Sequence, residues 1–319
     1  MPKVSVIVPI YGVEKYIERC ARSLFEQSLD DMEFIFVNDC TKDRSIELLK
    51  KVICEYPLRK KSTKIINKSK NQGLSKARET GILYSTGEYI CHCDSDDFVE
   101  PTAYEDMYKL AKMYDYDIVK AAHFVDYYDK TIVMPVYTQS HSVTNRDVLR
   151  YVFSWKGWNS IWSLLVKRSL YENVEFTPYA MLEDFFVTSQ LFLKAKKIGY
   201  CRSAYYHYIQ NPNSICGVKT NDAIINKYRQ ASYNIRNIIK KLTELQMSEY
   251  QTEIIRLKYE SLNILTPAMT DYKNYKIWGS EINLSPMEVL SNPYITKNEK
   301  LQYLLILLRL YPIFKQLKS

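Results

Sequence analysis

The sequence has little glycine and no regular cysteine framework, and its most apolar segment is too short to cross a bilayer. Only 8 of its 319 residues are glycine, against 28 tyrosines, and no glycine- or proline-rich linker or internal repeat divides it. Its 7 cysteines are odd in number and irregularly spaced, which argues against a disulfide-stapled secreted domain. The first residues lead directly into a strand pattern, without a signal peptide. We therefore expect free thiols and a reducing cytoplasm.

The charge balance is moderately basic. The chain carries 44 Lys and Arg against 36 Asp and Glu, a net charge of +8, which suits anionic partners such as nucleotides or a membrane surface. Nucleic acid is the least favoured partner, because the basic residues are dispersed and no recognition motif is present. The apolar share of 46% and the charged share of 25% are ordinary for a folded protein. The length suffices for one large domain, or one domain with an appendage.

The first hundred or so residues alternate between buried-strand and helix patterns. Apolar, mostly β-branched or aromatic runs at 3–9, 33–37, 63–67 and 89–93 predict four strands. Apolar residues at helical spacing predict a helix after each of the first three. This order implies right-handed crossovers and a mostly parallel sheet, as in an α/β protein.

Later segments add antiparallel signals to this pattern. We expect a helix at 102–113, a strand at 116–122 and a hairpin over 126–135, followed by a helix at 183–195 and a strand at 197–208. The hairpin makes the predicted sheet mixed, though still mostly parallel, with helices flanking it.

The character of the chain changes near its last third, where long helices are predicted. We therefore divide it into an α/β part over 1–215 and a helical part over 216–319. A last helix is predicted over 297–319, basic and very apolar, and its apolar run is broken by Arg309 and Pro312. This helix is compatible with a membrane surface, with packing on its own domain or with a second subunit of a homo-oligomer.

An acidic cluster ends the fourth predicted strand. Asp94, Asp96 and Asp97 lie within four residues of one another, immediately after an apolar run. Clustered carboxylates repel one another unless a cation or hydrogen-bond donors hold them, and the natural guest is Mn²⁺ or Mg²⁺. Taken alone, the cluster is better explained as an acidic turn that caps the next helix, and the rest of the chain reverses that preference.

The residues before this cluster include Cys91-His92-Cys93, which invites a zinc interpretation. Side chains alternate along a strand, which predicts one face with Tyr89, Cys91 and Cys93, and an opposite face with Ile90, His92 and Asp94. Since structural zinc needs convergent ligands, a zinc site is not favoured.

Each of the four loops that follow these strands carries unusual polar or aromatic residues. At one sheet edge they would supply an aromatic face, an acceptor for a base, a cation at a helix start and a metal site, which together complement a nucleotide diphosphate. In chain order the residues are Pro9 with Tyr11, Asp39, Asn71 with Gly73 and Arg78, and the acidic cluster.

These motifs resemble the family 2 glycosyltransferases of GT-A fold, over about residues 3–210. The resemblance implies a UDP-sugar donor, a divalent Mn²⁺ or Mg²⁺ ion and inversion at the anomeric carbon, and it makes 1–215 the catalytic domain. The matching segments are Val4-Ser5-Val6-Ile7-Val8-Pro9-Ile10-Tyr11, Phe36-Val37-Asn38-Asp39-Cys40-Thr41-Lys42-Asp43, Asn71-Gln72-Gly73 through Ala77-Arg78, and Gly87-Glu88-Tyr89 through Asp94-Ser95-Asp96-Asp97.

The resemblance also implies roles for the loop residues. Pro9 and Tyr11 would line the uracil and Asp39 would bind its edge. Asn71, Arg78 and Ser95 would complete the nucleotide pocket. Asp94 would lie on the ribose side and near the metal, and Asp96 would bind the metal itself.

A later acidic pair supplies the catalytic candidates. Glu183-Asp184 resembles the family's pair at a helix start, which implies Asp184 as the base and Glu183 as its support. Taken alone, the pair is also explained as acids stabilised by the helix dipole. By the same resemblance His207 is a metal ligand or phosphate contact, or else a satisfied histidine beneath the sheet.

Acceptor recognition is the part of the reaction that the sequence leaves open. Trp155, Trp158 and Trp162 are candidates for stacking on an acceptor sugar, although such residues are more often core. Many relatives carry a lysine where this chain has Leu164. The expected activity is transfer of a hexosyl or N-acetylhexosaminyl group to a glycan or lipid-linked acceptor in surface-polysaccharide synthesis. The alternatives are a sugar nucleotidyltransferase of similar fold, or a non-catalytic glycan- or partner-binding protein on a decayed transferase fold.

Overall fold

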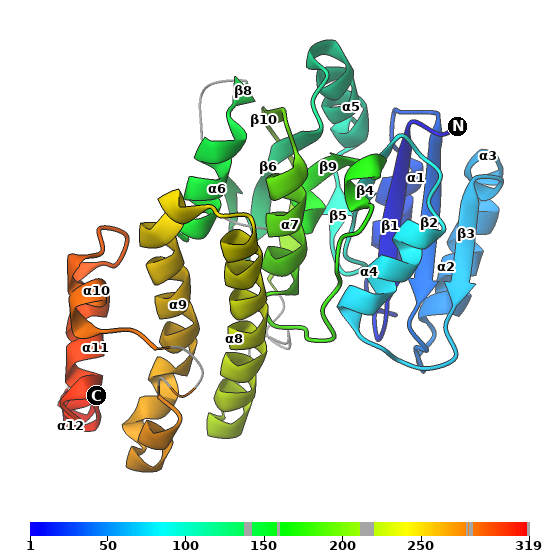
Figure 1. The fold of residues 1–319 in the computed structure, drawn as a ribbon. Coiled ribbons are helices and arrows are strands. Elements are labelled where there is room, and N and C mark those ends of the chain that lie inside the picture. The colour runs from blue at the N-terminus through cyan, green and yellow to red at the C-terminus, as the bar shows by residue number, and fades with distance from the viewer. Residues whose placement is uncertain (137–141, 158–159, 211–219, 279, 281–282, 318–319) are drawn as a thin grey trace. The chain divides into compact units, whose positions relative to one another are not determined.

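The computed structural model describes residues 1–319 except 137–141, 158–159, 211–219, 279, 281–282 and 318–319 (Figure 1). It contains two compact units, the first made of residues 1–147 and 159–211 and the second of residues 148–158 and 212–319. The short segment 148–158 thus belongs to the second unit, which the sequence did not suggest.

Within the described residues, the first unit is built on a mixed sheet of ten strands. The spatial order is β3-β2-β1-β4-β9-β6-β10-β5, with β7 beside β6 and β8 beside β10. The strands are β1 Val4–Ile10, β2 Met32–Asn38, β3 Thr63–Asn67, β4 Tyr89–His92, β5 Phe98–Val99, β6 Ile118–Asp126, β7 Thr131–Met134, β8 Ser142–Val143, β9 Leu164–Lys167 and β10 Ile198–Ile209.

The first four strands are parallel, as their apolar runs predicted. In Figure 1, β1 lies between β2 and β4, and β3 completes this half of the sheet. The other half is mixed, because β9 runs antiparallel to both β4 and β6, while β10 runs parallel to β6. The predicted hairpin is also confirmed, since β7 pairs antiparallel with β6. The expected α/β class with a mixed sheet is therefore correct.

Helices fill the connections of this unit. They are α1 Ile17–Phe25, α2 Ser45–Glu55, α3 Pro57–Lys60, α4 Leu74–Leu83, α5 Ala103–Tyr114 and α7 Glu183–Lys194, and α6 Asn145–Phe153 leads into the second unit. The main core joins one face of β1, β2 and β4 to α1, α2 and α5. On the other face α4 approaches β1 closely, because Gly81 leaves room for Ile7.

The second unit is helical. Its elements are the end of α6, α8 Asn221–Glu244, α9 Gln251–Leu265, α10 Pro286–Ser291, α11 Lys297–Leu307 and α12 Tyr311–Gln316, with short 3-10 segments between them. Thr220 caps α8, whose predicted apolar stripe is buried at Tyr228, Ile235, Ile238 and Leu242. Over the stretches that the structure describes, no helix combines the length and the apolar character needed to span a membrane.

Two elements differ from the sequence prediction. Strand β9, which joins the halves of the sheet, was not among the predicted strands. The single helix expected over 297–319 is two helices, because Arg309 adopts φ 59° between α11 and α12.

Candidate active site

The loops after β1, β2 and β3 are joined by side-chain hydrogen bonds to backbone amides. Thr41 accepts from the amide of Gly12 at 2.9 Å. Asp39 is buried and accepts from the amides of Gln72 and Gly73, the latter at 2.7 Å, and it pairs with Lys68 at 2.8 Å. Asp39 therefore fixes the loop after β3, immediately before the start of α4.

The other nucleotide-pocket candidates from these loops lie at the same sheet edge. Pro9 is buried near the end of β1, whereas Tyr11 is exposed just beyond it. Asn71 accepts a hydrogen bond from the amide of Gly73 at 2.9 Å, and Gly73 itself adopts φ 87° before α4. The structure thus brings Tyr11, Asp39 and Asn71 to one edge through linked loops, and their roles toward a base or ribose stay predictions.

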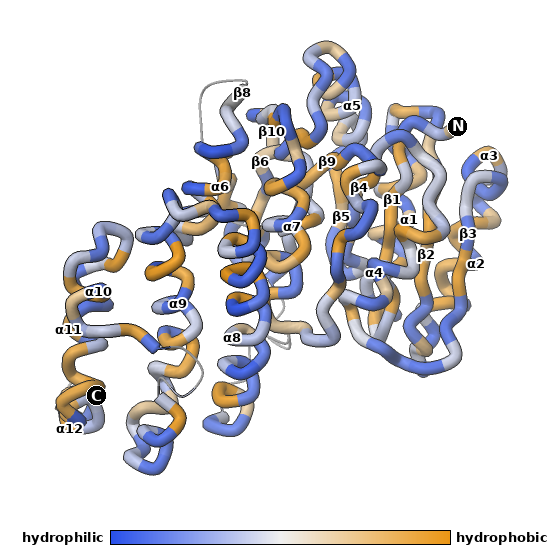
Figure 2. The backbone as a smooth tube through the Cα atoms, in the orientation of Figure 1, coloured by the Kyte–Doolittle hydropathy of each residue, from blue (hydrophilic) through white to orange (hydrophobic). Residues whose placement is uncertain are grey.

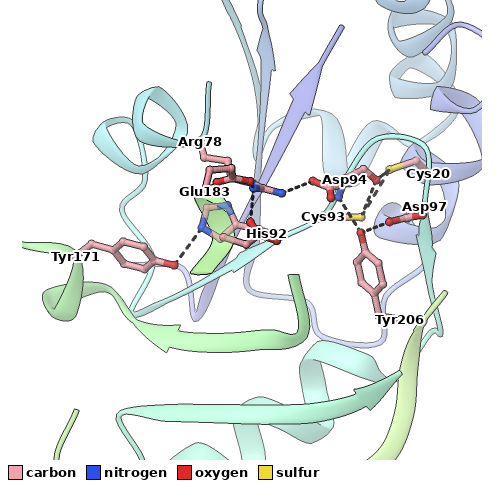
Figure 3. Close-up of polar contacts among 10 residues, drawn as sticks. Cys20, Arg78, His92, Cys93, Asp94, Asp97, Tyr171, Glu183 and Tyr206 are labelled. Carbon is pink, nitrogen blue, oxygen red and sulfur yellow. Dashed lines mark hydrogen bonds and ion pairs between the residues drawn. The ribbon is translucent and has the colours of Figure 1, made fainter. Parts of the chain in front are cut away.

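Tyr206 on β10 fixes the acidic loop after β4 (Figure 3). Its hydroxyl accepts from the amide of Asp94 at 2.9 Å and donates to the Asp97 carboxylate at 2.7 Å. The amide of Ile209 also donates to Asp97, at 2.8 Å. Burial raises the pKa of Asp97 well above its ordinary value. Asp97 thus positions the loop. Ser95, which follows Asp94 in the sequence, is also buried.

Asp96 has a different setting from Asp97. Its carboxylate forms no hydrogen bond with another residue in the part of the chain that the structure describes, while its backbone carbonyl accepts from Arg19 at 2.8 Å. Burial, together with the nearby charge of Asp94, raises the pKa of Asp96 to about 6. Such a carboxylate is the type of group that a cation would stabilise in its charged form.

Arg78 is the centre of the site. Its fully buried guanidinium contacts Asp94 at 2.7 Å and Asp184 at 2.5 Å, and it also pairs with Glu183 (Figure 3). Burial disfavours the charged guanidinium, but the three carboxylates outweigh this and hold its pKa well above the ordinary value. Arg78 thus connects the acidic loop to the acidic pair at the start of α7.

This geometry corrects the phosphate role expected for Arg78. The sequence suggested a cation one turn into α4 that would meet a phosphate. In the structure the guanidinium is turned toward three carboxylates and has no exposed surface to offer a ligand. Its role is to hold acidic side chains, because leaving them buried without a counter-charge would cost several kcal/mol.

Glu183 and Asp184 differ in their exposure. Glu183 is buried, and burial raises its pKa well above the ordinary value despite the attraction of Arg78. The Asp184 side chain is 27% exposed, so this carboxylate, not that of Glu183, can meet a substrate.

His207 does not have the setting of a metal ligand, which corrects the expectation for it. Its Nδ1 lies 2.8 Å from Asp126 and its Nε2 lies 2.9 Å from Glu100, so both ring nitrogens already have carboxylate partners. The ring is stacked between Phe98 and Phe124, at centroid distances of 4.1 and 4.4 Å. His207 thus fits the alternative of a satisfied histidine.

The predicted separation of His92 from Cys93 across the strand is confirmed. His92 faces Tyr171, with its Nε2 3.1 Å from the tyrosine oxygen, while Cys93 lies 3.8 Å from Cys20 on the opposite face of the strand (Figure 3). The described residues contain no group of three His, Cys, Asp or Glu side chains placed to hold a metal by themselves.

Sequence reasoning missed the roles of Tyr206 and Lys120, whereas for Trp162 it favoured a position in the core. Trp162 is buried and stacks on Tyr206 with a centroid distance of 4.2 Å, which places it in the core and supports the acidic loop from behind. Lys120 on β6 donates to Ser163 at 3.1 Å, and burial lowers its pKa to about 8 although Asp184 attracts its charge. A lysine inside the apolar strand pattern 118–122 was the available signal. Trp158 lies outside the described residues.

Comparison with known proteins agrees with this geometry. The family described as "Glycosyl transferase family 2" matches residues 5–179. A relative from Bacillus subtilis strain 168, "Uncharacterized glycosyltransferase EpsJ", is 30% identical over 243 residues, which are 74% of this chain and 69% of that protein.

Solved structures share the fold at low sequence identity. S. aureus TarS 1-349 in complex with UDP-GlcNAc has a TM-score of 0.63 and 16% identity, over 99% of this chain and 92% of that one. The mannosyltransferase PcManGT from Pyrobaculum calidifontis, in complex with GDP-Man and Mn²⁺, has a TM-score of 0.56 and 15% identity, over 99% and 87%. From the family match and the relative, this chain belongs to the family 2 glycosyltransferases.

Proposed function

We propose that this chain is a metal-dependent, inverting glycosyltransferase that moves a hexosyl or N-acetylhexosaminyl group from a UDP-sugar to a glycan or lipid-linked acceptor. Family membership supports the transfer of a sugar. The donor is inferred from the loops at one sheet edge and from TarS, a protein of the same fold described with UDP-GlcNAc. EpsJ, a relative of this chain, carries only the general name of glycosyltransferase.

The arrangement around Arg78 is the observation that carries this proposal. One guanidinium contacts Asp94, from the loop after β4, and Asp184, from the start of α7. The acidic loop and the partly exposed carboxylate are therefore adjacent, although they lie far apart in the sequence. A donor diphosphate at the first and an acceptor hydroxyl at the second would meet in reacting distance, which is the main requirement for transfer.

The acidic loop fits a divalent cation. Asp96 is without a hydrogen bond to another described residue, and burial together with the charge of Asp94 raises its pKa to about 6. Mn²⁺ and Mg²⁺ are often held by one or two carboxylates together with substrate phosphates, so a full set of protein ligands is not needed. We assign Asp96, with Asp94 beside it, to the ion, which when bound offsets the charge on the leaving diphosphate.

Asp184 is the proposed general base. As the acceptor oxygen bonds to the anomeric carbon, the bond from that carbon to the donor diphosphate breaks, and Asp184 takes the hydroxyl proton. Attack from the face opposite the diphosphate inverts the configuration. Glu183, buried against Arg78, helps to keep the guanidinium in place beside the base.

The remaining loop residues are assigned to the nucleotide. Tyr11 is exposed and offers an aromatic face at the end of β1, where Pro9 stiffens the backbone. Asp39 and Asn71 already order the loop of residues 71–73, and base or ribose contacts would add to that role. We place the reaction in the cytoplasm, in the synthesis of a surface polysaccharide.

Donor turnover tests this proposal. Hydrolysis and binding of a panel of UDP- and GDP-sugars would be measured with Mn²⁺ and with EDTA, on the natural chain and on Asp96→Ala. GDP-sugars are included because PcManGT is described with GDP-Man. We expect Mn²⁺-dependent turnover of one UDP-sugar, lost in Asp96→Ala. Glu47→Ala, an exposed acid on α2, serves as the matched control. Metal-independent binding, or none to any nucleotide sugar, would contradict the assignment of the acidic loop.

A further inference from the structure

The helices α11 and α12 expose an unusual number of large apolar side chains. Leu308 is 66% exposed and Leu301 is 48% exposed. Along residues 301–317 the exposed members of this set are Leu301, Leu307, Leu308, Leu310, Ile313 and Leu317. In Figure 2 much of the tube through these helices is orange. A cluster of this kind on a folded protein indicates an interaction site.

Helix α11 is apolar on both of its sides. Tyr303 and Ile306 are buried and anchor the helix to its own unit. Leu301, Leu304, Leu305 and Leu308 recur at helical spacing on the opposite side, so they are directed away from those anchors. The inner side explains the folding of the helix. In the outer row of leucines, Leu301 and Leu308 are exposed, and Leu304 and Leu305 are partly buried.

The charges around this row are almost all positive. Lys297, Lys300, Arg309 and Lys315 lie along residues 297–317. The single acid in that stretch is Glu299, which is only 18% exposed and pairs with Arg256 at 3.2 Å. Cations that flank an exposed apolar row match a surface that is apolar below and negatively charged above.

We propose that residues 297–317 dock on the surface of a membrane containing anionic lipids, with the leucine row in the headgroup boundary and the basic side chains against the phosphates. The segment lies along the surface, since neither helix is long enough to cross a bilayer. A second copy of the chain is the poorer occupant, because it would bring the same positive charges together. This docking does not depend on the transferase proposal, though it would hold the enzyme beside a lipid-linked acceptor.

Vesicle flotation with the full chain tests the docking. Phosphatidylcholine vesicles would be compared with vesicles that also contain about 30 mol % phosphatidylglycerol, at low and high salt. We expect binding to the anionic vesicles that weakens as salt is raised. The double variant Leu301→Gln/Leu308→Gln should bind at least about tenfold more weakly. Lys297→Gln/Lys315→Gln should lose the preference for anionic lipid.

The matched control is Leu83→Gln/Met113→Gln, which changes two apolar residues of the first unit that are even more exposed than Leu301 and Leu308. It should bind vesicles like the natural chain. Thermal unfolding and UDP-sugar binding in solution would show that each variant is folded and that its donor site is intact, which separates this test from that of the transferase. An unchanged Leu301→Gln/Leu308→Gln variant, or an equal loss in the control, would overturn the proposal. So would a dimer in sedimentation that this double variant disperses, since that result assigns the leucine row to a second copy.

Discussion

At the scale of single residues, the site is held together by a buried guanidinium and the acidic side chains that compensate its charge. Arg78 is shared by three acidic side chains, and burial raises the pKa of one of them, Glu183, well above its ordinary value. The motifs pointed to each of these residues. They could not show that Arg78 contacts Glu183, because such an ion pair between distant positions depends on how the two loops meet in space.

Replacing either of the two acids at the start of α7 by its amide should have unequal effects on kcat. Asp184→Asn removes the proposed base, so kcat should fall about 10²- to 10⁴-fold while donor affinity stays unchanged. Glu183→Gln replaces a buried acid by an amide of the same shape, whose oxygen can still accept from Arg78, so kcat should stay within about tenfold of the natural enzyme. Steady-state kinetics with separate donor titrations would measure both. Equal losses in the two variants would assign the proton transfer to neither residue alone.

Lys120 provides a pH-dependent test at the same scale. Burial lowers its folded-state pKa to about 8, below the ordinary value of 10.5 that applies when the chain is unfolded. Between these two values the folded protein binds fewer protons, so the stability of the natural chain should rise with pH by on the order of 2 kcal/mol. Lys120→Met should lack this rise, and it should be the more stable protein at pH 7.

Urea unfolding at several pH values from 7 to 10.5 would measure this difference. The comparison of the two proteins cancels the titration of tyrosines and cysteines that both contain. If the difference in unfolding free energy between the two proteins does not change with pH, burial does not lower the pKa of Lys120.

At the scale of elements, the sequence predicted most strands but not the one that joins the two halves of the sheet. Strand β3 has the bounds that its apolar run indicated. In contrast, β9 is the four-residue run Leu164–Lys167, and so short an apolar run is equally consistent with a helix. Its antiparallel contacts with β4 and β6 come from distant parts of the chain, and local periodicity does not report them.

The packing of α4 on β1 yields a prediction about one glycine. A Cβ atom added at Gly81 would lie 2.3 Å from Cγ2 of Ile7, so Gly81→Ala should push α4 away from β1 and destabilise the protein by about 1–3 kcal/mol. Ile7→Ala removes the opposing methyl group. Gly81→Ala/Ile7→Ala should therefore cost less than the sum of the two single changes. Additive costs in urea unfolding would indicate that the two side chains do not meet.

At the scale of the whole molecule, the two units have separate cores. The first is centred on the strands β1, β2 and β4, and the second on buried side chains of α8 and α9. The proposed donor and metal residues all belong to the first unit, whereas the proposed membrane surface belongs to the second. We therefore expect ligands of the first unit to stabilise that unit alone.

Calorimetry of the full chain can test whether ligands of the first unit stabilise that unit alone. We expect two unfolding transitions, and UDP with Mn²⁺ should raise the midpoint of only one, because a ligand stabilises the unit that binds it by about 2.7 kcal/mol at a concentration of 100 times its Kd. Asp96→Ala should abolish the metal-dependent part of that shift without moving the other transition. Ile238→Ala, a cavity in the core of α8, should instead lower the transition that UDP leaves unchanged. If UDP and Ile238→Ala move the same transition, the two units unfold together, and the helical unit is then part of the structure that binds the donor.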